Sequence, residues 1–221
     1  MTKKVAIPPM ITDIVASGII DLDGFLFDAA GRCPCCGGEL KSHDIKHRVF
    51  ARINTGIMNA DMRLFADVRA LKKAGGRGSD GKDGVGAGSA GSMGPGAGGE
   101  DGNGGAGSCS RECNITVNVK RWYCTDCGKL VYSKSPFYEG IRTGAPIVDF
   151  CIVNRDLHPP NHIAKILGKL GIIVTPATVR NIQQSEISKG ATPENIPAVN
   201  IYGIMFPSSL LNLSEMTRRG K

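Results

Sequence analysis

The sequence predicts an α+β fold, in which a small β-hairpin unit with a long insertion is followed by a three-helix unit. Three observations lead to this prediction. Two Cys-x-x-Cys-Gly motifs begin at Cys33 and Cys124, and each adjoins a segment that alternates apolar and basic residues. A glycine-rich tract lies between the two motifs. After the second motif, three segments repeat apolar residues with the period of a helix.

The two cysteine motifs predict a tetrahedral zinc site. A two-residue gap lets both sulfurs of a motif reach one ion, and four thiolates from two motifs match the ligand set of structural Zn²⁺. The glycine after each motif suits a tight turn. Cys35 lies inside the first motif and could compete as a ligand, but the usual spacing favours the outer pair. The predicted ligands are Cys33, Cys36, Cys124 and Cys127.

The segments beside the motifs predict the strands of a zinc ribbon. Residues 45–53 and 115–123 alternate apolar and polar or basic side chains, as strands with one buried face do. A third strand is expected at 130–132, with Pro136 ending it. The predicted ribbon therefore comes in two halves, residues 31–53 and 115–136.

A long insertion, residues 54–114, separates the two halves of the predicted ribbon. Its first part, about 57–73, has helical periodicity and good helix formers, which predict one helix. Residues 74–108 are about half glycine and cannot offset their own conformational entropy, so we expect a flexible, disordered linker. Because a longer loop adds closure entropy only logarithmically, the zinc site remains possible. Cys109 and Cys113 leave three readings open: a second metal half-site, a reversible disulfide, or two incidental thiols.

The N-terminal segment, residues 1–30, predicts a short amphipathic helix over about 10–18. Asp13, the Pro8-Pro9 pair and the lack of a small-residue cleavage pattern argue against a signal peptide. No apolar run reaches the length of a membrane span. Cysteines with metal-ligand spacing indicate a reducing compartment. We therefore expect a cytoplasmic, nucleoid-associated protein with no membrane partner.

Residues 137–190 predict a helix-turn-helix domain. Asn161 is the expected cap of its second helix, and Gly171 lies just beyond that helix. Thr175 is the expected cap of the third, with Pro176 at the first helical position. This order of apolar helix, glycine turn and polar helix is typical of a helix-turn-helix, although any small three-helix bundle with a polar outer face shows the same periodicity. The three helices are expected at about 146–155, 161–170 and 175–188.

Basic residues concentrate on the motif-bearing parts of the chain, while the net charge of the whole is +7. Residues 32–73 and 115–190 together carry about +10, a pattern that favours binding to a phosphate backbone. Arginine can pair with guanine edges, and asparagine or glutamine with adenine edges. The start of a helix can hold a phosphate. The predicted nucleic-acid contacts are Lys46, Arg48, Arg52, Lys120 and Arg121 on the ribbon, and Thr175, Thr178, Arg180, Asn181 and Gln184 on the third helix.

Four segments carry a resemblance to a known family: CPCCGGEL (33–40), VKRWYCTDCGKL (119–130), SPFYEGIRTGAPIVDFCIV (135–153) and IAKILGKLGIIVTPATVRNI (163–182). In this order they resemble the N-terminal region of prokaryotic insertion-sequence transposases, particularly archaeal ones. The resemblance covers roughly residues 31–190 apart from the insertion. It implies a zinc ribbon and a helix-turn-helix that recognise terminal repeats in duplex DNA. In the family, an RNase H-like domain with three acidic residues on Mg²⁺ follows.

The tail, residues 191–221, departs from that family pattern. It contains only Glu194 and Glu215 as acids, whereas an RNase H-like site needs three separated carboxylates on several paired strands. We therefore expect a non-catalytic DNA-binding protein whose tail is a possible remnant of a catalytic domain. It could act as a homodimer or beside a separate catalytic chain.

Two other functions stay open from the sequence. One is an RNA- or transcription-machinery-associated zinc-ribbon protein, for which Trp122 and Tyr123 are the candidate stacking residues. The other is the DNA-binding subunit of a transposase whose catalytic acids lie on another chain.

Overall fold

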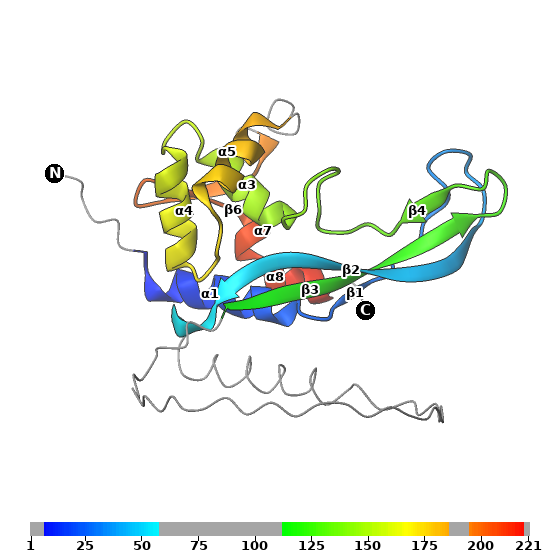
Figure 1. Ribbon diagram of the computed structural model, residues 1–221, viewed down its shortest axis with the longest axis horizontal. Coiled ribbons are helices and arrows are strands. Elements are labelled where there is room, and N and C mark those ends of the chain that lie inside the picture. Colours follow the sequence, from blue (N-terminus) through cyan, green and yellow to red (C-terminus); the bar gives the residue numbers. More distant parts are fainter. Residues whose placement is uncertain (1–6, 58–111, 186–194, 219–221) are drawn as a thin grey trace, which may run out of the picture.

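The computed structural model describes residues 7–57, 112–185 and 195–218 of the 221-residue chain. The described chain mixes helices and sheets, so the predicted α+β class is confirmed (Figure 1). The predicted helix over 57–73 lies outside the described residues apart from its first residue, as do the glycine-rich stretch, Cys109 and the end of the predicted third helix. None of the described helices is long and apolar enough to cross a membrane.

Two long strands, β2 (Leu40–Asn54) and β3 (Glu112–Cys124), pair antiparallel along their whole length. We call this pair the arm. β3 is its central strand, because β1 (Leu26–Phe27) pairs with it in parallel and β4 (Leu130–Tyr132) pairs with it antiparallel. The strand predicted at 130–132 is confirmed, and the two predicted at 45–53 and 115–123 are present but longer. The helices gather at the end of the arm where β2 stops and β3 begins, and β4 lies at the other end (Figure 1).

The inner part of the arm belongs to the hydrophobic core. Ala51 and Ile115 lie opposite each other across the two strands, as do Ile53 and Cys113, and Ile53 is almost wholly buried. Toward the far end, the pairs that follow carry Arg48, Lys46 and Asp44 on β2. The two strands that the alternating pattern predicted therefore form an arm. Its base is buried, and its far half is mostly exposed.

Helix α3 (Ala145–Val153) lies in the middle of the core. Nearly all its residues are buried, which explains why its sequence is apolar on every side. It ends at Val153, two residues before the predicted end, because Asn154 leaves the helical conformation (φ −100°, ψ 1°). Its buried Asp149 accepts hydrogen bonds from Tyr138 Oη at 2.5 Å and Ser209 Oγ at 2.6 Å. The burial of Tyr138 and its hydrogen bond to Asp149 raise the pKa of Tyr138.

Helices α4 (Pro160–Lys169) and α5 (Pro176–Gln184) follow, and α5 packs on both α4 and α3. The prediction of Asn161 as the cap of α4 is wrong: the cap is Pro159, because Pro160 already occupies the first helical position. The prediction of Thr175 as the cap of α5 is confirmed, since its Oγ1 accepts the Thr178 N–H at 3.2 Å. The helix ends at Gln184 rather than near residue 188, because the next residue is extended.

The two ends of the described chain pack together. α1 (Pro9–Asp21) is longer than the predicted 10–18 and buries one face, and α8 (Leu213–Arg218) packs against it. The contact is so close at Gly18 that a Cβ there would lie 2.6 Å from Leu213 Cβ. Before α8, the hairpin β5 (Ala198–Ile201) and β6 (Ile204–Pro207) leads into α7 (Ser208–Leu211), which packs on α3. Residues of the predicted segments 1–30, 137–190 and 191–221 thus share one hydrophobic core.

Candidate metal centre and nucleic-acid interface

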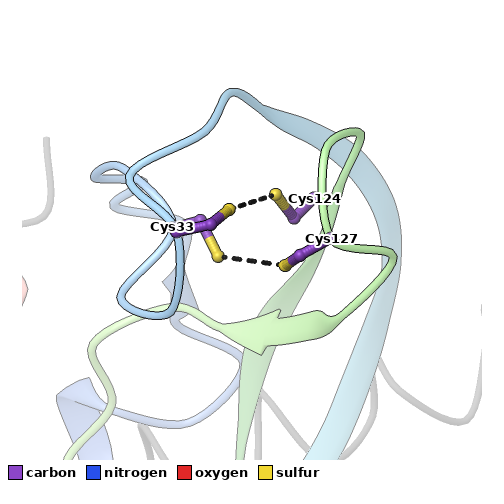
Figure 2. A group of neighbouring side chains, drawn as sticks. Cys33, Cys124 and Cys127 are labelled. Carbon is purple, nitrogen blue, oxygen red and sulfur yellow. Dashed lines mark hydrogen bonds between the residues drawn. The ribbon is translucent and has the colours of Figure 1, made fainter.

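The far end of the arm brings the four predicted cysteines together. Cys33 Sγ lies 3.7 Å from Cys127 Sγ, and Cys36 Sγ lies 3.4 Å from Cys124 Sγ. All four sulfurs lie within 4.8 Å of one another. Figure 2 shows Cys33, on the loop before β2, beside Cys127 in the turn that follows β3 and near Cys124 at the end of that strand. Among the described residues this is the one group of three or more His, Cys, Asp or Glu side chains that could hold a metal ion.

The two cysteine loops have the same backbone design. The Gly37 N–H donates to Cys33 O at 2.8 Å, and the Gly128 N–H donates to Cys124 O at 3.0 Å. Both glycines have positive φ angles, 75° and 71°, a conformation that costs little only for glycine. The glycine in each motif is therefore required by the turn that points both sulfurs inward.

The ionisation of the thiols shows why this cluster suits a cation. The backbone N–H groups of Cys36 and Cys35 lower the pKa of Cys33 to about 6. The Gly38 N–H acts in the same direction on Cys36, but the neighbouring thiols of Cys124 and Cys127 outweigh it and raise the pKa of Cys36 to about 12. The thiol of Cys33 therefore ionises readily, whereas the neighbouring thiols penalise the ionisation of Cys36. A divalent cation would remove that penalty, and four cysteines at these distances are compatible with zinc.

Cys35 is separate from the cluster. Its thiol is exposed and accepts a hydrogen bond from Lys129 Nζ at 3.0 Å. The spacing argument that favoured Cys33 and Cys36 over Cys35 therefore agrees with the geometry. Cys113 is half-buried on β3, and Cys151 is buried in α3, where burial raises its pKa to about 12.

Two of the predicted phosphate contacts on the arm are engaged within the protein. Arg121 donates to both carboxylate oxygens of Asp44, with Nε 2.6 Å from Oδ1, and this pairing lowers the pKa of Asp44. Arg48 donates to Ile141 O at 2.9 Å, and its guanidinium lies 3.8 Å from the centre of the Phe137 ring. Arg121 holds β2 to β3, and Arg48 holds the loop before α3 against the arm.

The other three predicted arm contacts differ in exposure. Lys46 and Arg52 are exposed, and Lys120 is half-buried. Lys120 Nζ lies 4.5 Å from the centre of the Trp122 ring, while Trp122 Nε1 donates to Ser133 Oγ at 2.7 Å. One face of the indole is therefore covered by a cation of the same strand.

The predicted base contacts form one stripe on α5. Arg180, Asn181 and Gln184 are exposed, together with Ala177, as expected for positions i, i+3, i+4 and i+7 on one helix face. The opposite face buries Val179 and Ile182. Within the described chain, no hydrogen bond or ion pair engages the side chains of Arg180, Asn181 or Gln184. No described residue therefore competes with a partner for these side chains.

The turn between α4 and α5 is attached to the edge of β2. The Ile173 N–H donates to Arg52 O at 2.8 Å, and the Asn54 N–H donates to Gly171 O at 2.8 Å. Ahead of α3, the Gly144 N–H donates to Phe50 O at 2.9 Å. These bonds join the arm at the backbone to the turn between α4 and α5 and to the loop before α3. The sequence gives no local signal for them, because their partners lie about a hundred residues apart.

Comparison with protein-family models, with curated proteins and with solved structures found no match.

Proposed function

We propose that this chain is a zinc-dependent, duplex-DNA-binding protein related to transposases, in which α4 and α5 form a helix-turn-helix and the arm is a zinc ribbon. The observation that carries the proposal is the stripe of Arg180, Asn181 and Gln184 on the outer face of α5. The inner face of the same helix is fixed in the core. A rigid helix that presents Arg, Asn and Gln side chains, unpaired among the described residues, has the chemistry to read base edges in a major groove.

The surroundings of α5 support an anionic partner. Lys165 and Lys169 are exposed on α4, and Arg52 is exposed where β2 meets the turn before α5. Such side chains would contact phosphates on either side of the groove and fix the orientation of the helix without reading sequence. The local excess of positive charge would make binding strongly dependent on salt.

The proposed zinc ion would have a structural role. The far end of the arm has little apolar core of its own, since Lys41, Tyr123 and Leu130 are exposed there. The sheet there, formed by β2, β3 and β4, lacks the broad buried hydrophobic face that a small sheet needs to be stable by itself in water. Four thiolates on one ion would tie the loop before β2 to the end of β3 and supply folding free energy directly.

The relation to transposases rests on the order of modules, ribbon first and helix-turn-helix second, together with the motifs of the sequence. Catalysis in that family uses three carboxylates on metal ions. The described residues gather no such carboxylate group, so we propose that this chain by itself does not cut DNA. A metal-dependent cleavage assay on the chain alone tests this, and Mg²⁺-dependent nicking of a duplex would contradict it.

An RNA-binding role has weaker support from the geometry. Single-stranded RNA readers stack unpaired bases on exposed aromatic faces. Trp122 has one face covered by Lys120 and its ring nitrogen bonded to Ser133, which leaves Tyr123 as the more accessible ring beside the cysteines.

The proposed function is tested by measuring affinity for a duplex DNA and for a structured RNA of the same length at one fixed salt concentration, by fluorescence anisotropy. We expect tighter binding to the duplex DNA. Preferential binding to the RNA would support the alternative, and no binding to either polymer would overturn both.

A further inference from the structure

A pocket of about 230 Å³ lies where the edge of β2 meets the loop before α3 and the turn before α5. We call it the junction pocket. Its buried lining includes Phe50, Ile147 and Ile172, none of which is exposed to solvent. Its exposed lining includes Arg52, Arg142 and Thr175. The pocket thus has an apolar floor and a polar, cationic mouth.

The walls of the junction pocket are fixed by backbone hydrogen bonds. On one side the Gly144 N–H is bonded to Phe50 O, and on the other the Ile173 N–H is bonded to Arg52 O. A Cβ at position 144 would lie 2.3 Å from the Phe50 ring, so the first wall approaches β2 as closely as glycine allows. Both sides of the pocket are therefore tied to β2 through the backbone.

The mouth of the pocket offers positive charge that the described protein does not neutralise. Among the described residues no carboxylate lines it, and none of them forms an ion pair or hydrogen bond with the side chains of Arg52 or Arg142. Two guanidinium groups beside one opening would repel each other and favour an anion between them.

Hydroxyl groups complete this mouth. Thr175 Oγ1 and Thr178 Oγ1 lie 2.9 Å apart, so one O–H donates to the other oxygen. The hydrogen of the second hydroxyl then remains available to an outside acceptor. Arginine forks and a hydroxyl donor are groups that commonly bind phosphate oxygens.

We propose that the junction pocket holds one sugar-phosphate unit of a bound DNA strand, an inference that rests on the proposed function. The phosphate oxygens sit between Arg52 and Arg142, and the deoxyribose lies over the apolar floor. Thr178 belongs both to this pocket and to α5. The bound sugar-phosphate unit therefore fixes the start of α5 on the same DNA strand that the arm contacts. Arg142 thereby becomes a DNA contact that the sequence motifs did not indicate.

The test compares Arg142→Gln and Arg52→Gln with Arg218→Gln, which removes the same charge from α8 and does not line the pocket. Binding to a mixed-sequence DNA duplex is measured by fluorescence anisotropy over a series of salt concentrations. We expect each pocket variant to weaken binding several-fold and to reduce the slope of log K against log salt by about one. Arg142→Lys keeps the charge and retains most of the slope. The Arg218→Gln control keeps the wild-type slope.

The outcomes separate the pocket from the proposed function. One result is that the wild type binds duplex DNA while Arg142→Gln and Arg52→Gln weaken this binding no more than the control Arg218→Gln does. That result overturns the pocket proposal and leaves the proposed DNA binding intact. No duplex binding by the wild type overturns both. Titration with thymidine monophosphate distinguishes a free nucleotide from a DNA strand as the source of the phosphate. If Arg142→Gln loses binding of the mononucleotide but keeps its affinity for the duplex, the pocket is a free-nucleotide site and the proposal is contradicted.

Discussion

The side chain of Asn154 pairs with the backbone of Met205 as a neighbouring strand would. Its Nδ2 donates to Met205 O at 2.7 Å, and its Oδ1 accepts the Met205 N–H at 3.0 Å. Asn154 is fully buried at the end of α3, and the same Nδ2 also donates to Phe150 O. One carboxamide therefore ends α3 and attaches β6 to it.

Replacing Asn154 tests this attachment. Asn154→Ala removes the partners of the half-buried N–H and C=O of Met205, so we expect a loss of about 1–3 kcal/mol in the free energy of unfolding. Urea denaturation measures it. Asn161→Ala is the matched control on an exposed position of α4 and should change the stability by less than about 0.5 kcal/mol. Equal stabilities of the two variants would show that β6 does not depend on Asn154.

The cysteine cluster predicts different outcomes for two adjacent thiols. Cys36 lies in the cluster, while Cys35 is exposed outside it. Cys36→Ser should abolish stoichiometric zinc binding and lower the melting temperature, and Cys35→Ser should keep both at wild-type values. Elemental analysis of the purified proteins and thermal melting with and without a chelator measure these effects. Loss of zinc in Cys35→Ser alone would mean that the ligand set is wrongly assigned.

Two glycines should respond oppositely to alanine. A Cβ at Gly144 would lie 2.3 Å from the Phe50 ring, whereas nothing lies within 4 Å of a Cβ at Gly168 in α4. Gly144→Ala should therefore cost about 1–3 kcal/mol through overpacking. Gly168→Ala should stabilise the protein by about 0.5–1 kcal/mol, because alanine loses less backbone entropy in a helix. Thermal or urea unfolding of both variants decides, and a stable Gly144→Ala protein would contradict the close packing of this loop on β2.

The Asp44–Arg121 pair predicts a pH dependence on the acid side. Arg121 lowers the pKa of Asp44 in the folded protein, so the pair contributes stability above the ordinary aspartate pKa of about 3.9 and loses it as pH falls through the lower folded value. An NMR titration of the Asp44 carboxyl carbon should show a midpoint well below about 3.9. In Asp44→Asn this acid-dependent part of the stability should disappear. A midpoint at the ordinary value would mean that the pair does not persist in solution.

Local signals predicted much of this structure. The turn glycines of the cysteine motifs, the Thr175 cap with Pro176 behind it, and the alternation in β2 and β3 each act over a few residues, and each element is present. The stripe on α5 was also predictable, because helical period alone places Arg180, Asn181 and Gln184 on one side.

Contacts between distant segments were not predictable from one sequence. No periodic pattern in the sequence indicates the backbone bonds between β2 and the turn at Gly171. The same holds for the packing of α8 on α1 at Gly18. For the same reason Arg48 and Arg121 looked like exposed basic residues, while their partners Ile141 and Asp44 became evident only in three dimensions. Charge and periodicity in a sequence indicate which side chains could contact a partner. Tertiary packing decides which of them are already engaged within the protein.

The most direct test of the central claim is the salt dependence of duplex DNA binding by the wild type and by the triple variant Arg180→Ala, Asn181→Ala and Gln184→Ala, measured by fluorescence anisotropy. These side chains are exposed and do not support the core, so circular dichroism should show the same fold and stability for both proteins. We predict that the wild type binds duplex DNA with an affinity that falls steeply as salt rises, and that the triple variant loses at least about tenfold in affinity for a preferred site. A wild type that does not bind duplex DNA at low salt, or a triple variant that binds as tightly as the wild type, would contradict the account.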